Sequence, residues 1–256
     1  MSTVSFRSII ALGFAATVLV HSGCASEEKL VAPTSLRSPW EGERVWAVAP
    51  LTNESGVSTV DTFRLSDQFV IELDGVEGIS CLSLNRTLAG MQALGMRQVT
   101  NDADARSLMR VLQTDGLLVA AVTAYDPYRP LQLGIAAQVY TADDAAAAAT
   151  DVSELTMARG GDEGSTRTAA RSGPSSQTSR VYAANNHAVL AKVGEYAAGR
   201  HNPRSGLRKN VYLASMDSYA RFVAYDVVRE LLAAEFAQRA PLPTEEEAGA
   251  AKKKSQ

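Results

Sequence analysis

The fold is decided by positions 44–56, which read Arg-Val-Trp-Ala-Val-Ala-Pro-Leu-Thr-Asn-Glu-Ser-Gly. The run from Val45 to Leu51 is mostly apolar on both alternations, which predicts a strand buried on both faces of a sheet. Pro50 lies near the end of this strand, where a missing backbone N–H is tolerated. Asn53 and Ser55 then begin a turn, because their side chains suit local hydrogen bonds to the backbone. These two residues are also candidates for a contact surface.

The chain after this strand alternates between strand and helix patterns. Asp61 or Thr62 can cap a first helix, and Asn101 or Asp102 can cap a later one. The order of elements predicts an α/β domain with a single mixed β-sheet and packed helices. The expected strands are 79–84, 117–125, 131–140 and 180–183, and the expected helices are 61–73, 85–94, 102–112, 188–198 and 215–238.

Residues 117–140 predict an antiparallel hairpin. Its second strand alternates regularly, with Leu131, Leu133, Ile135, Ala137 and Val139 on one inward face. The tip reads Asp-Pro-Tyr-Arg-Pro at positions 126–130. With Tyr125, Tyr128 and Arg129, this tip is the best candidate in the core for an exposed contact surface. Packing of the tyrosines along the prolines is the alternative.

The long carboxy-terminal helix has an apolar stripe and a charged face. Val223, Val227 and Leu231 recur at intervals of four residues, while Asp226, Arg229 and Glu230 gather on the opposite side. We expect this helix to dock on the sheet through the stripe.

The amino terminus predicts export. An apolar run from Ile9 to Val20 has the length of a signal-peptide core and is too short to span a bilayer. Small residues then precede Cys24, in a pattern that resembles a bacterial lipobox, although His21 stands where a leucine is usual. The resemblance implies lipidation of Cys24, a membrane anchor there, and, because Ala25 follows, the outer membrane facing the periplasm. Cleavage after Ala25 with ordinary secretion is the alternative.

These patterns divide the chain into segments. We expect a signal peptide at 1–23, a flexible tether at 24–43, an α/β domain at 44–239 and a disordered tail at 240–256. The stretch 143–179 is rich in Ala, Gly, Ser and Thr, and it predicts a disordered insertion within the domain because it holds too little apolar surface to offset its ordering entropy.

Three short motifs resemble one envelope family. The first strand and turn are similar to the Val-x-Pro-Phe-x-Asn-x-Ser-Gly opening of that family, with Leu51 in place of the aromatic residue. Leu-Ser-Asp at 65–67 is similar to its Leu-Ala-Asp, and Thr-Asp-Gly at 114–116 to its Gly-Ala-Asp. The family glycine inside the following strand is absent, with Ala120 and Ala121 there instead. The family includes the curli secretion lipoprotein, lipoprotein activators of peptidoglycan synthases, and the amino-terminal domain of the Tol-Pal translocation protein.

Composition and motifs favour a binding protein over an enzyme. The 256 residues carry a net charge of −3, which gives no reason to expect a nucleic-acid partner. Serine-hydrolase, phosphate-loop, zinc-protease and Cys-x-x-Cys motifs are missing, so we expect no catalytic residue, no metal and no cofactor. Cys81 is expected to be a buried small hydrophobe.

The sequence predicts an envelope lipoprotein that binds or regulates another envelope component. A subunit of an outer-membrane secretion assembly like the curli lipoprotein, or an unrecognised secreted enzyme, are the alternatives.

Overall fold

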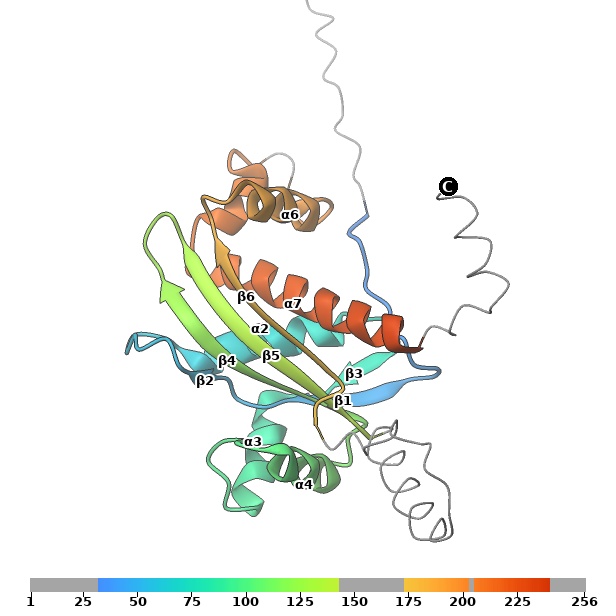
Figure 1. Ribbon diagram of the computed structural model, residues 1–256. Coiled ribbons are helices and arrows are strands. Elements are labelled where there is room, and N and C mark those ends of the chain that lie inside the picture. The colour runs from blue at the N-terminus through green and yellow to red at the C-terminus, as the bar shows by residue number, and fades with distance from the viewer. Residues whose placement is uncertain (1–31, 143–172, 203–204, 240–256) are drawn as a thin grey trace, which may run out of the picture. The chain divides into compact units, whose positions relative to one another are not determined.

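The computed structural model describes residues 32–142, 173–202 and 205–239. They form a mixed β-sheet with helices on both of its faces (Figure 1). The predicted α/β class and single mixed sheet are confirmed. The strands are β1 Arg44–Val48, β2 Thr52–Asn53, β3 Ile79–Cys81, β4 Gly116–Asp126, β5 Gln132–Thr141 and β6 Ser176–Ala183, and the helices are α2 Thr62–Asp74, α3 Leu84–Ala93, α4 Asp102–Leu112, α6 His187–Ala197, the 3₁₀ helix η2 Arg208–Leu213 and α7 Met216–Arg239.

The strand order is β3-β1-β4-β5-β6, and β2 also pairs with β4. The strand β1 is parallel to both of its neighbours, with Trp46 opposite Cys81 on one side and opposite Gly116 on the other. The predicted hairpin is confirmed, since β4 and β5 pair antiparallel from Gly116 and Thr141 to Asp126 and Gln132. The strand β6 is antiparallel to β5 and forms one edge of the sheet.

Alternate residues of β1 contribute to two separate cores, as the sequence predicts. Trp46 and Val48 belong to the larger core, which lies under α2, α6 and α7. Ala47, together with Ala49 just after the strand, belongs to the smaller core under α3 and α4. Both faces of the strand are therefore buried, which explains why its sequence shows no polar alternation.

Side-chain caps fix the starts of two helices where the sequence predicts them. The Asp61 carboxylate accepts a 3.0 Å hydrogen bond from the Arg64 N–H at the start of α2. The Asn101 side chain accepts a 2.9 Å bond from the Asp104 N–H at the start of α4. Each cap satisfies an N–H that has no partner within the helix.

The prediction of a flexible tether up to Glu43 is wrong for its last part. Arg37 forms a parallel β-bridge with Glu77, next to β3. Trp40 is 8% exposed, and its ring lies 5.1 Å from the ring of Trp46. The prolines of this segment suggested a spacer, but the β-bridge and the buried indole hold it on the core. Residues 24–31 lie outside the described residues, as do the predicted signal peptide and tail.

The predicted disordered insertion at 143–179 also extends too far along the chain. Its last residues, Ser176 to Ser179, form the first half of β6 and pair with β5, where Ser176 lies opposite Val139. Their polar composition suggested disorder, but an edge strand needs apolar side chains on one face at most, and β5 supplies the backbone partners. Residues 143–172 of the predicted insertion lie outside the described residues.

Candidate interaction surfaces

The predicted contact residues Asn53 and Ser55 hydrogen-bond within their own turn. The Asn53 Oδ1 accepts bonds from the Ser55 N–H at 3.1 Å and from the Ser55 hydroxyl at 2.7 Å. The Asn53 side-chain amide donates to the Val57 carbonyl at 2.8 Å. Gly56 follows with a φ of +75°, which favours glycine. These side chains therefore shape the turn from β2 towards α2.

The other three predicted contact residues, at the hairpin tip, differ in their exposure. Tyr125 is half-buried against the larger core, and burial beside Asp217 and Asp61 raises its phenol pKa. Tyr128 points outward with 79% of its surface exposed. Arg129 is exposed, and its guanidinium donates a 3.4 Å hydrogen bond to the Ala214 carbonyl. Tyr128 and Arg129 form a surface feature at the tip, whereas Tyr125 does not reach it.

A groove lies on the sheet face opposite α2 and α7. Helices α3 and α4 cover this face only near β1 and the start of β4, and the described residues place no helix over the rest (Figure 1). The groove has a volume of about 600 Å³. Small or polar side chains from three adjacent strands line it, including Val119, Ala121, Ala136, Gln138, Gln177 and Ser179. Their alternation with the buried residues of β4 and β5 is the sequence signal that could have located this open face.

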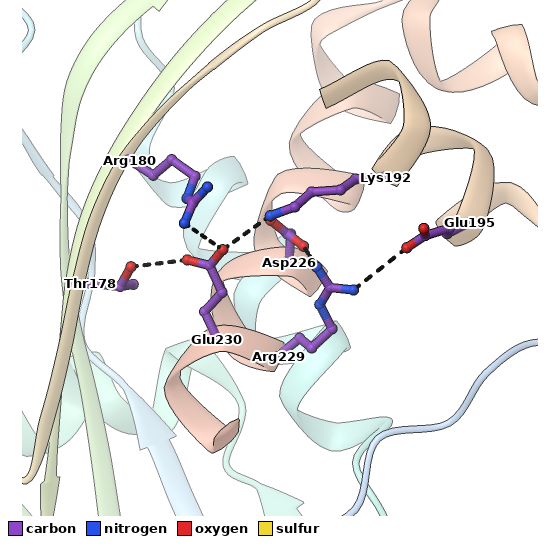
Figure 2. A network of polar contacts seen from close by, with 7 residues as sticks. All are labelled: Thr178, Arg180, Lys192, Glu195, Asp226, Arg229 and Glu230. Atoms are coloured by element: carbon purple, nitrogen blue, oxygen red, sulfur yellow. Dashed lines mark hydrogen bonds and ion pairs between the residues drawn. The ribbon is translucent and has the colours of Figure 1, made fainter. Parts of the chain in front are cut away.

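A charged network joins α7 to α6 and β6 (Figure 2). Asp226 is only 1% exposed. The Lys192 ammonium lies 2.6 Å from its carboxylate and 3.0 Å from that of Glu230, and Arg229 also pairs with Asp226. The Arg180 guanidinium lies 3.0 Å from Glu230. The sequence placed this charged face opposite the apolar stripe of α7, but α6 and β6 cover it, so the network serves to dock these elements together.

A cleft of about 300 Å³ lies beside this network, between the amino-terminal segment, α6 and α7. Its aromatic wall includes Tyr196, whose hydroxyl donates a 2.7 Å hydrogen bond to the Glu72 carboxylate. Burial raises the pKa of both the Tyr196 phenol and the Glu72 carboxyl. Arg200 covers the Tyr196 ring, with its guanidinium carbon 4.6 Å from the ring centre. These contacts satisfy the polar groups of the cleft internally, which favours a structural role.

The thiol of Cys81 is a poor nucleophile. Burial, with a contribution from the nearby Asp74 carboxylate, raises its pKa to about 12, so it stays protonated at neutral pH. Its Sγ lies 3.7 Å from the Leu82 carbonyl. No group of three or more potential metal ligands occurs among the residues that the structure describes. Across the same residues, no helix combines the length and apolar character needed to cross a membrane.

Neither a protein-family model nor a curated protein sequence matches the chain. Several solved structures resemble it distantly. The LpoB C-terminal domain from Salmonella enterica is 12% identical, with a TM-score of 0.33, over 50% of this chain and 82% of that one. Lipoprotein GNA1162 from Neisseria meningitidis is 16% identical, with a TM-score of 0.36, over 63% of this chain and 99% of that one. The hypothetical protein CT253 from Chlamydia trachomatis is 11% identical, with a TM-score of 0.32, over 77% and 95%. At such values the similarity does not extend to family membership or to function.

Proposed function

We propose that this chain is a bacterial cell-envelope lipoprotein, anchored to the outer membrane through Cys24, whose α/β domain binds another envelope protein without catalysing a reaction. The observation that carries the binding role is the open sheet face beside the edge strand β6. The lipobox-like sequence before Cys24 supports the anchor.

The chemistry of the open face suits an extended protein segment. An edge strand presents backbone N–H and C=O groups on its outer side, and a partner strand can pair with them. The strand β6 offers eight residues for such pairing, and Val181 on it is 51% exposed. The small side chains of the adjoining groove would let the side chains of a partner approach the sheet. Backbone pairing would supply affinity, and the groove would supply selectivity.

The anchor has a direct test. Labelled palmitate should be incorporated into the full chain expressed in a bacterial host, and the Cys24→Ala variant should lose the label. Retention of the label in Cys24→Ala would refute lipidation at this residue.

The binding surface is tested by photo-crosslinking in intact envelopes. A crosslinking residue is placed at Ser179 or Val181, and as a control at Arg86, which is exposed on α3. We expect both β6 positions to trap the same protein and the α3 position not to trap it. A second substitution, Gln177→Lys, should weaken both crosslinks because it puts a charge into the groove. Identical products from all three positions would count against the proposal.

A further inference from the structure

The hairpin tip and the start of η2 meet at one groove, and we call the exposed residues of these two segments the tip surface: Tyr128, Arg129, Leu207, Arg208 and Lys209. Arg129 and Leu207 line the same groove, which has a volume of about 350 Å³. The bond from Arg129 to the Ala214 carbonyl, at 3.4 Å, ties the hairpin to the segment after η2. The tip surface is thus built from two parts of the chain about 80 residues apart.

The tip surface combines positive charge with exposed apolar side chains. Its two largest apolar groups, Tyr128 and Leu207, are 79% and 51% exposed. Its three cationic side chains are all exposed. In the hairpin itself the carboxylate of Asp126 accepts a 3.0 Å bond from the Tyr128 N–H and caps the turn. Aromatic rings and long cationic side chains together suit a lipid headgroup layer. There the ring and the aliphatic part of the cationic side chain contact the acyl chains, and the charged group contacts lipid phosphate.

The amino-terminal segment joins the domain beside α6, and α6 packs on η2, the element that carries Arg208 and Lys209. The Thr34 carbonyl accepts a 2.8 Å hydrogen bond from Arg200. Arg200 covers Tyr196 at 4.6 Å, and the ring of Tyr196 lies 4.9 Å from that of Tyr212 in η2. The first described residues accordingly lie beside α6 (Figure 1).

The length of chain between anchor and domain limits how far the domain can move away. Cys24 and Thr34 are ten residues apart. A fully extended chain of that length spans at most about 36 Å. An acylated Cys24 would therefore keep the tip surface at a high effective concentration near the bilayer, so that even weak contacts are occupied.

From these observations we propose that the tip surface docks on anionic lipid headgroups of the membrane that holds Cys24. The proposal rests on the anchoring proposed above and adds an orientation to it. With the tip surface on the membrane, the first half of β6 and the groove of about 600 Å³ beside it lie towards the other end of the β5–β6 pair and stay accessible to a protein partner.

The test uses the full acylated chain in vesicles of phosphatidylethanolamine, with or without phosphatidylglycerol. A fluorescent label is attached at Pro127→Cys, in a Cys81→Ala background, and quenched by iodide from the aqueous phase. We expect less quenching when phosphatidylglycerol is present. Each cationic residue near an anionic surface changes binding about fivefold, so Arg129→Gln with Lys209→Gln should lower the ratio of docked to undocked domain about 25-fold. High salt should also lower this ratio, because it screens the attraction between the cationic side chains and the lipid.

Two matched controls accompany this measurement. Arg86→Gln with Arg97→Gln removes two exposed charges on and just after α3 and should leave the quenching unchanged. A label at Gln98→Cys should be quenched equally in both kinds of vesicle. Equal quenching at Pro127→Cys with and without phosphatidylglycerol would overturn the docking, as would equal protection at Gln98→Cys.

The two proposals fail in different ways. Sedimentation of the chain with vesicles reports the anchor, and its loss in the wild-type chain would overturn both. Retained sedimentation without protection at Pro127→Cys would overturn the docking alone. Protection by an added acidic polypeptide but not by anionic lipid would also overturn it and would assign the tip surface to a protein.

Discussion

Replacing Lys192 with methionine tests the role of the buried charged network. The substitution keeps the length of the apolar stem and removes the ammonium group, which lies 2.6 Å from Asp226 and 3.0 Å from Glu230. Asp226 is 1% exposed, so water cannot replace the lost partner. The carboxylate keeps Arg229 as a counter-charge.

The expected cost follows from these contacts. Removing one partner of a buried ion pair costs about 3–5 kcal/mol, because the other charge is left without compensation. Because Arg229 still compensates the Asp226 charge, we expect Lys192→Met to lie at the lower end of this range and to lower the free energy of unfolding by about 3 kcal/mol. For a domain of this size that corresponds to a fall in Tm of about 6–12 °C.

Urea unfolding of the full chain, followed by circular dichroism, measures this cost. Lys209→Met is the matched control, because Lys209 is exposed in η2, and we expect it to change stability by less than about 0.5 kcal/mol. The double variant Lys192→Met with Asp226→Leu should recover much of the loss, because an apolar pair carries no desolvation penalty. A cost below about 1 kcal/mol for Lys192→Met, or no recovery in the double variant, would refute the network as the contact that docks α6.

Three further substitutions or reactions test the core. Gly116→Ala should destabilise the domain by about 3 kcal/mol in the same assay, because the added Cβ would lie 2.3 Å from the Trp46 ring; an unchanged midpoint would show that this ring can move. Trp40→Ala should cost about 3–5 kcal/mol, because the Trp40 ring packs against Trp46 in a tilted arrangement and the Arg239 guanidinium lies 4.9 Å over it. An unchanged stability would show that this segment is a tether that adds nothing to the core. The thiol of Cys81, with a pKa of about 12, should react with a disulfide reagent at pH 8 at least tenfold more slowly in the native chain than in urea, and equal rates would contradict its burial.

Much of the fold was predictable because it is encoded in short, local patterns. The continuous apolar run of β1 predicted burial on both faces, and the alternation of Leu131, Leu133 and Ile135 predicted the inward face of β5. The caps Asp61 and Asn101 fixed two helix starts. Each of these signals depends on residues within a few positions of one another, so no knowledge of the rest of the chain is needed to interpret it.

The candidate surfaces were less predictable because they depend on which distant segments meet. Tyr128 and Arg129 were identified from their turn. Leu207, which lines a groove together with Arg129, lies between the helices expected at 188–198 and 215–238, where the sequence predicted no element. Asn53 and Ser55 were predicted as contact residues, but their side chains hydrogen-bond to each other and to the Val57 carbonyl within their own turn.

The sequence by itself determined the α/β class, the central strand and the hairpin, because periodicity and capping are properties of neighbouring residues; export through a Cys24 anchor stays a prediction. Only the tertiary structure decided that Ser176 to Ser179 form a strand, that Trp40 belongs to the core, that Asp226 is buried against Lys192, and which face of the sheet stays open. Pairing, burial and charge compensation each need a partner from elsewhere in the chain, and that partner is chosen by packing.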